Sequence, residues 1–76
     1  MKKEDKLNSS YLKKVGQKIR EIRNEKNITQ VELGYRCNFE QPSIARIEAG
    51  RTNPNLLTLK KIAEALDVPI EELFKF

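Results

Sequence analysis

The 76-residue sequence contains no histidine or tryptophan and only one cysteine, Cys37. A single cysteine excludes an intramolecular disulfide, and without histidine a structural zinc site is implausible. Histidine is also the commonest general base, and the sequence has no glycine-rich phosphate loop and no pair of carboxylates at a recognisable spacing. We therefore expect a binding protein rather than an enzyme, with no metal or other cofactor.

Long apolar runs are also missing. No stretch is long enough to span a membrane or to form the core of a signal peptide, so we expect a cytoplasmic protein without a membrane partner. The length allows one small domain, near the limit at which a single core is sufficient for stability. The net charge of +4 is compatible with a polyanionic partner. The last ten residues have the opposite sign of charge, because they contain three acidic residues and one lysine.

The stretch from Thr29 to Gly50 predicts two short helices joined by a tight turn. Thr29 and Glu32 have the spacing of a capping box, which indicates a helix start. Asn38 tolerates the left-handed conformation that ends a helix, and Gly50 can end the second one. Two apolar residues at helical spacing, Ile44 and Ile47, place the second helix from about residue 41 or 42 to 49.

Three further helices follow from the apolar pattern. One over residues 11–26 has a stripe of Leu12, Val15, Ile19 and Ile22, with its cap at Asn8, Ser9 or Ser10. Another spans residues 56–66, with Leu56, Leu59, Ile62, Ala63 and Leu66 on one face. Pro69 begins a short last helix that carries Ile70, Leu73, Phe74 and Phe76. Residues 1–10 are polar and predict a flexible basic tail.

These residues together carry a resemblance to a known family. Gln30, Leu33, Gly34, Asn38, Ile44, Ile47, Glu48 and Gly50 resemble the helix-turn-helix of the phage repressor and Cro family, also called the XRE family. The similarity extends from about Val15 to Phe74. It implies an all-α fold, a compact five-helix lambda-repressor-like bundle, with residues 11–76 forming the DNA-binding domain.

The resemblance also implies which residues meet DNA. If Ile44 and Ile47 face inward, then Gln41, Pro42, Ala45 and Arg46 face outward, at the family's base-reading positions. Gln41 has the amide geometry that pairs with adenine, and Arg46 has the fork that pairs with guanine. Phosphate contacts are expected from Gln30, Ser43, Arg51 and Asn53. The alternative for Gln30 is an exposed residue that needs no partner, and the tail is either solvated or an arm that touches DNA.

Arg23 and Glu48 match a pair of family positions that form a partly buried ion pair. This pair would join the first long helix to the end of the DNA-reading helix; the alternative is two independent surface charges. Cys37 lies four residues after Leu33, which predicts a buried, apolar thiol.

The stretch Glu40-Gln41-Pro42 departs from the family. Glu40 replaces the usual Ser or Thr cap and adds a negative charge beside the expected DNA surface. Pro42 disfavours the α conformation at Gln41, which indicates that Gln41 is the cap and Pro42 the first helical residue.

The leading hypothesis is a sequence-specific regulator of transcription that binds double-stranded DNA without a small-molecule effector. One reading helix covers only a few base pairs, so we expect a homodimer on a pseudo-palindromic operator. Phe74 and Phe76 are the expected dimer contacts. The rival hypothesis is a protein-interaction module that keeps the fold, and association with RNA is a more remote third.

Overall fold

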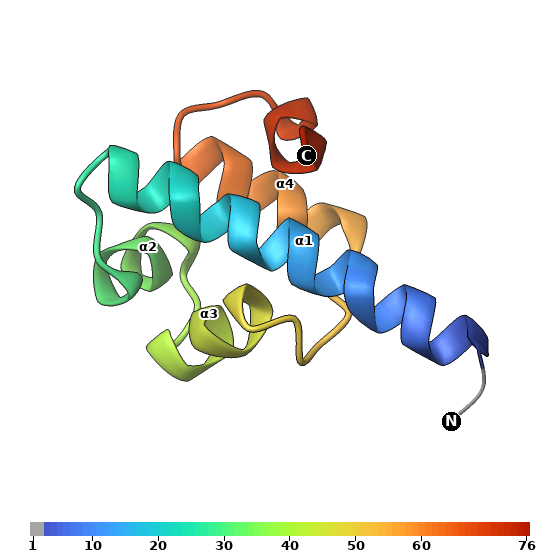
Figure 1. The fold of residues 1–76 in the computed structure, drawn as a ribbon. Helices are drawn as coiled ribbons and strands as arrows, with labels where there is room; N and C mark the ends of the chain where they lie inside the picture. The colour runs from blue at the N-terminus through green and yellow to red at the C-terminus, as the bar shows by residue number, and fades with distance from the viewer. Residues whose placement is uncertain (1–2) are drawn as a thin grey trace.

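The computed structural model describes residues 3–76, with side chains from residue 8 onward. The elements are α1 (Lys3–Glu25), α2 (Gln30–Cys37), α3 (Gln41–Glu48), α4 (Leu56–Ala65) and the 3-10 helix η1 (Ile70–Phe74). The all-α bundle is confirmed, and no strand occurs in residues 3–76. The fifth helical segment is of the 3-10 type, not α as the predicted five-helix count implied. In Figure 1, α1 crosses the molecule with α3 below it and η1 above it.

The first helix begins earlier than predicted. It starts at Lys3, so the expected start near Tyr11 is wrong, and Asn8, Ser9 and Ser10 are helical residues rather than caps. The added turns are polar, and no apolar stripe indicates them in the sequence. Lys and Glu nevertheless have high helix propensity, and acidic residues favour a helix N-terminus. The predicted tail overlaps these turns, and its first two residues lie outside the part that the structure describes.

The predicted ends of the short helices have simple local causes. The Thr29 side chain accepts a hydrogen bond of 3.0 Å from the backbone N–H of Glu32, as a cap should. Asn38 is left-handed, with φ 59°, and Gly50 has φ 71°. Both positions therefore reverse the chain within one residue.

The predicted cap of α3 is wrong by one residue. Glu40 is the cap, with extended backbone and no side-chain cap bond, and Gln41 is the first helical residue. Pro42 falls in the first helical turn, where its missing N–H has no intrahelical partner to lose. The first turn therefore accommodates Pro42 with Gln41 already helical.

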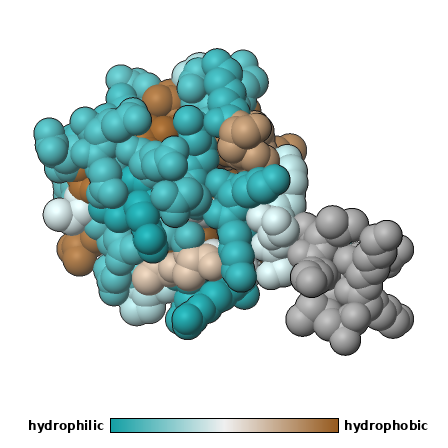
Figure 2. All heavy atoms as spheres, viewed as in Figure 1, coloured by the Kyte–Doolittle hydropathy of each residue, from teal (hydrophilic) through white to brown (hydrophobic). Residues whose placement is uncertain are grey.

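The core lies where α1 crosses the other helices. It contains the buried side chains Val15, Ile19, Ile22, Ile28, Leu33, Cys37, Ile44, Ile47, Leu59, Ile62, Ala63, Leu66 and Leu73. On the face shown in Figure 2, hydrophobic residues form small separate areas in a mostly hydrophilic surface. None of the described helices has the length and hydropathy that a membrane span requires.

Gly16 allows α1 and the end of α3 to touch through their backbones. A Cβ on Gly16 would lie 2.5 Å from the carbonyl oxygen of Glu48 and 2.8 Å from its carbonyl carbon. Real Cβ atoms do not come so close to a backbone, and neither helix has a flexible group there that can move aside. The contact fixes the distance between α1 and the last turn of α3.

Replacing Gly16 with Ala tests this contact. Alanine favours a helix by about 1 kcal/mol over glycine, but overpacking against a backbone costs about 1–3 kcal/mol. Because the nearest atoms all belong to the backbone, we expect a cost in the upper part of this range, and therefore a net decrease of about 1–2 kcal/mol in the free energy of unfolding, measured by urea denaturation. Lys14→Ala, at an exposed position of the same helix, is the control and should change this value by less than about 0.5 kcal/mol. A Gly16→Ala protein as stable as the wild type would contradict the close approach.

Candidate nucleic-acid interface

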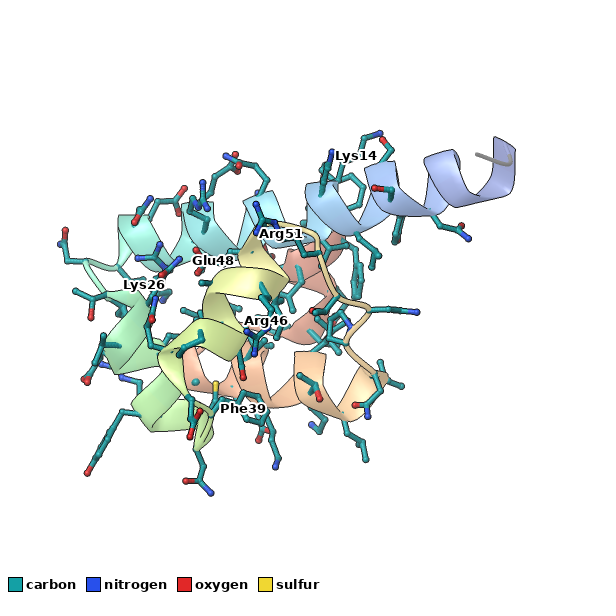
Figure 3. All side chains as sticks on the ribbon, turned by 90° about the horizontal axis from the view of Figure 1, so that it is seen from below. Lys14, Lys26, Phe39, Arg46, Glu48 and Arg51 are labelled. Carbon is teal, nitrogen blue, oxygen red and sulfur yellow. The ribbon has the colours of Figure 1, made fainter. Side chains whose placement is uncertain are left out.

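The outer side of α3 is presented to solvent by the packing of its inner side. Ile44 and Ile47 are buried in the core, whereas Pro42 and Arg46 are exposed. Figure 3 looks at this side of the molecule and shows Arg46 and Arg51 on it. Arg46 has no ion-pair partner among residues 8–76, so its guanidinium is available to a ligand.

Arg23 and Glu48 form a buried ion pair between α1 and the last residue of α3. The Arg23 Nε donates to Glu48 Oε2 at 2.7 Å, and its Nη2 donates to Oε1 at 3.0 Å. The third Arg23 nitrogen donates to the carbonyl of Ile28 at 2.8 Å. The two residues are only 9% and 3% exposed, so the alternative of two independent surface charges does not hold. The pair fixes α3 on α1 and, through Ile28, on the turn before α2.

Glu48 stays ionised in this environment. Burial acts to raise the pKa of its carboxyl group, but hydrogen bonds from Arg23, Gln30 and Arg20 and the charge of Arg23 outweigh burial. The net effect is a pKa below the ordinary value of 4.5. Glu48 is therefore a carboxylate at neutral pH, with oxygens that only accept hydrogen bonds.

A chain of side-chain amides leads from Glu48 to the start of α3. Gln30, the first residue of α2, donates from Nε2 to Glu48 Oε1 at 3.0 Å. Gln41 donates from Nε2 to Gln30 Oε1 at 2.7 Å. Both glutamines are half-buried, so neither residue is fully enclosed in the core. The predicted phosphate-binding Gln30 and the predicted base-reading Gln41 are thus in direct contact.

The other predicted contact residues differ in exposure. Ser43 and Ala45, on α3, are half-buried. Arg51 and Asn53 are exposed in the loop between α3 and α4, and the backbone N–H of Arg51 donates to the carbonyl of Arg46 at 3.0 Å. The loop therefore continues directly from the last turn of α3, with Arg51 close to the outer surface of that helix.

The sequence-based prediction missed two basic residues at this site. Arg20 reaches Glu48 Oε1 at 3.4 Å, with a side chain that is 43% exposed. Its position three residues before Arg23, on the same face of a helix, was the signal available in the sequence. Lys26 is exposed in the turn before α2, on the face seen in Figure 3.

Arg36 and Cys37 serve the scaffold. Arg36 donates to the carbonyl of Ala65 at the end of α4, at 3.1 Å, so its guanidinium is engaged away from α3. Cys37 is buried, as predicted, with its Sγ 3.8 Å from the carbonyl of Lys61. Burial raises the pKa of the Cys37 thiol, partly opposed by the charge of Lys61. The thiol therefore stays protonated at neutral pH.

The two phenylalanines expected at a dimer contact lie in different environments. Phe74 is half-buried against the core and lines a cavity of about 110 Å³ together with Tyr11, Leu12, Val15, Ile47, Asn53, Pro54 and Leu59. Phe76 is 55% exposed and packs edge-on against Tyr11, with ring centroids 5.4 Å apart. The Lys14 ammonium lies 5.9 Å from the Phe76 ring.

This arrangement of two short helices, the second held with its outer side exposed, is that of a helix-turn-helix DNA-binding protein. The family described as "Helix-turn-helix" matches residues 19–73. The chain belongs to this family, the XRE family of DNA-binding transcriptional regulators, whose members are not enzymes.

Relatives of known name or structure agree with this membership. The chain is 41% identical over 59 residues to the immunity repressor protein of Bacillus phage phi105, covering 78% of this chain but only 41% of that protein. It is 39% identical over 62 residues to control protein C.BamHI of Bacillus amyloliquefaciens, covering 80% and 76% of the two chains. The crystal structure of the restriction-modification controller protein C.AhdI from Aeromonas hydrophila is similar with a TM-score of 0.84 and 33% identity, covering 87% and 96%.

Glu48→Gln tests the ion pair through its pH dependence. Because the pKa of Glu48 is lowered by folding, its contribution to stability is complete above about pH 4.5 and is lost as the pH falls through the folded-state pKa. Leaving Arg23 buried without its partner should cost about 3–5 kcal/mol near neutral pH. We expect the difference in unfolding free energy between the two proteins, measured by urea denaturation, to be constant near neutral pH and to narrow as the pH falls below about 4.5.

Glu64→Gln removes an exposed carboxylate from α4 and is the matched control, with an expected change below about 0.5 kcal/mol. A difference between Glu48→Gln and wild type that does not depend on pH would show that the Glu48 charge contributes nothing to the native state.

Proposed function

We propose that this protein is a repressor or autoregulator that binds a specific double-stranded DNA operator as a homodimer, with α3 in the major groove. The observation that supports this most directly is the rigid attachment of α3 through Arg23 and Glu48, with Arg46 left unengaged on the outer side. A helix held in this way fits the width of the B-DNA major groove.

In this proposal four residues of α3 meet the base edges. Gln41 pairs with adenine N6 and N7, and Arg46 pairs bidentately with guanine O6 and N7. Pro42 and Ala45 offer apolar contacts, for example to the methyl group of thymine. Glu40, exposed at the start of α3, either opposes nearby phosphates or accepts from cytosine N4.

Phosphate contacts flank the reading helix on both sides. Gln30 is the first residue of α2, where free backbone N–H groups and the helix dipole favour an anion. An open groove lies beside it, lined by Arg23, Asn24, Asn27, Ile28, Thr29, Gln30, Val31 and Gln41. Ser43 approaches the same DNA strand as Gln30. Arg51 and Asn53 contact the DNA backbone from the loop after α3. Phosphate contacts on both sides of α3 set the register of this helix in the major groove.

Selection of binding sites from random DNA duplexes tests the proposal. We expect an enriched sequence with two related halves, whose centres lie about one helical turn, or roughly 34 Å, apart. Arg46→Ala should weaken binding to the selected duplex by about 1–3 kcal/mol and relax the preference at one base pair per half. Arg51→Ala should weaken binding to all sequences and reduce the salt dependence of the affinity by about one unit of slope.

Lys18→Ala is the matched control. Lys18 is half-buried on α1 and lies near Glu72 of η1. In Figure 1, η1 and α3 lie on opposite sides of α1. Removal of Lys18 changes the net charge by the same amount as Arg46→Ala but should leave sequence preference unchanged. The proposal is wrong if selection yields no enriched sequence and Arg46→Ala binds duplex DNA as well as the wild type. That outcome would favour a protein-interaction module.

The dimer contact that we propose includes Phe74 and Phe76. Phe76 is more than half exposed, and Tyr11 beside it is 51% exposed, so this end presents aromatic surface to solvent. A small domain gains stability by covering such a surface with a second copy.

Phe76→Ala should therefore raise the dimer dissociation constant at least about tenfold, since one buried phenylalanine contributes roughly 1.5–3 kcal/mol. Sedimentation equilibrium measures this constant. Tyr35→Ala removes an aromatic side chain that is 84% exposed on α2 and should leave dimerisation unchanged. A Phe76→Ala protein that dimerises as the wild type does would exclude this contact.

A further inference from the structure

The amide groups of Gln30 and Gln41 have a fixed direction, and Glu48 sets it. The Glu48 carboxylate can only accept hydrogen bonds, so the Gln30 atom 3.0 Å from its Oε1 must be the amide nitrogen. The Gln30 oxygen then faces Gln41. Because an amide oxygen can only accept, the Gln41 atom at 2.7 Å from it must also be nitrogen. The direction follows from the charge on Glu48 and the two distances.

We infer that Glu48, which lies in the core and does not reach the DNA surface, is a specificity-positioning residue: it orients the Gln41 amide with its nitrogen toward α2 and its oxygen toward the base pair. This inference rests on the proposed role of Gln41 in base reading. It adds a second role to a residue that otherwise serves to attach α3.

The consequence for base recognition follows from donor and acceptor positions. In its fixed orientation Gln41 presents an oxygen that accepts and one remaining N–H that donates. Adenine offers the matching pair, because its N6 donates and its N7 accepts. Guanine offers two acceptors, O6 and N7, so its O6 would face the Gln41 oxygen. A Gln41 amide that is free to rotate can place its two N–H groups toward guanine, and the discrimination between the two purines falls.

The hydrogen bonds of Glu48 support a single donor-to-acceptor direction in the series from Gln41 through Gln30 to Glu48. Its Oε2 is held by Arg23 at 2.7 Å, and its Oε1 accepts from Arg23, Gln30 and, at 3.4 Å, Arg20. Every group that faces the carboxylate is therefore a donor. The side chain of Glu48 has no exposed surface, so water does not compete for these positions. The pKa of Glu48 is lowered, which keeps the carboxylate charged through the neutral range.

Two variants interrupt the chain at different points. Gln30→Met removes the bridging amide with little change in side-chain length and leaves the Arg23–Glu48 pair in place. Glu48→Gln removes the charge that sets the direction, and circular dichroism establishes whether it folds. Gln41→Ala identifies the base pair that Gln41 reads, as the position whose preference disappears.

The measurement is the ratio of dissociation constants for two duplexes that carry guanine or adenine at that position. The wild type should prefer adenine by about ten- to a hundredfold. In Gln30→Met the ratio should fall below about threefold, with the preference at the Arg46 position unchanged, and folded Glu48→Gln should behave in the same way. Loss of a phosphate contact by Gln30→Met weakens binding to both duplexes equally and cancels in the ratio.

The outcomes separate this inference from the function on which it rests. If Gln41→Ala removes a preference but Gln30→Met keeps the wild-type ratio within twofold, Glu48 does not direct Gln41, while the proposed function stands. If Gln41→Ala changes no base preference, the proposed reading by Gln41 is wrong, and this inference is wrong with it.

Discussion

The ion pair between Arg23 and Glu48 is the interaction on which the placement of α3 depends. Two charges are removed from water, and a three-point set of hydrogen bonds from Arg23 compensates for their desolvation. Apolar side chains of equal volume could pack as tightly, but they would not fix the rotation of α3 relative to α1. Because the guanidinium and carboxylate planes must match, the pair sets both the distance and the rotation of α3 relative to α1.

Backbone contacts also hold the last turn of α3 against α1. Gly16 brings α1 against the carbonyl group of Glu48, and Gly50 places the chain after α3 against the backbone of Lys13. A side chain at Gly50 would be strained by its positive φ and would also meet Lys13. The last turn of α3 is therefore held by rigid contacts on two successive turns of α1. The start of α3 is held differently, through the Gln30 and Gln41 side chains.

The sequence predicted those features of the fold that arise within a few residues of one another. The Thr29 cap and the reversals at Asn38 and Gly50 follow from local conformational preference, and the apolar stripes identify each core-facing side. The family resemblance indicated the Arg23–Glu48 pair. The contact of Gly16 with α3 joins positions about thirty residues apart and leaves no periodic pattern. The first turns of α1 were missed because their sequence is polar and contains no apolar stripe.

The contact between Gln30 and Gln41 could not be predicted for a related reason. Each residue was predicted to touch DNA, but their mutual hydrogen bond depends on the rotation of α3 and on the cap at Glu40, which the sequence misplaced by one residue. Similarly, the Arg36 guanidinium donates to the carbonyl of Ala65 at the end of α4, a contact between distant residues that no local pattern in the sequence indicates. Side chains with several available partners need the tertiary arrangement to decide between them.

The separation of Arg46 from the scaffold has an evolutionary consequence. Exchanging an exposed residue that has no structural partner usually changes stability by less than about 0.5 kcal/mol, so Pro42 and Arg46 can vary at little cost to folding. Gln41 has no such freedom, because its amide belongs to a chain of hydrogen bonds that ends in the core. In the function that we propose, descendants of this protein would therefore acquire new operators most easily by changing the outer two positions, while the base pair read by Gln41 would change only together with the scaffold.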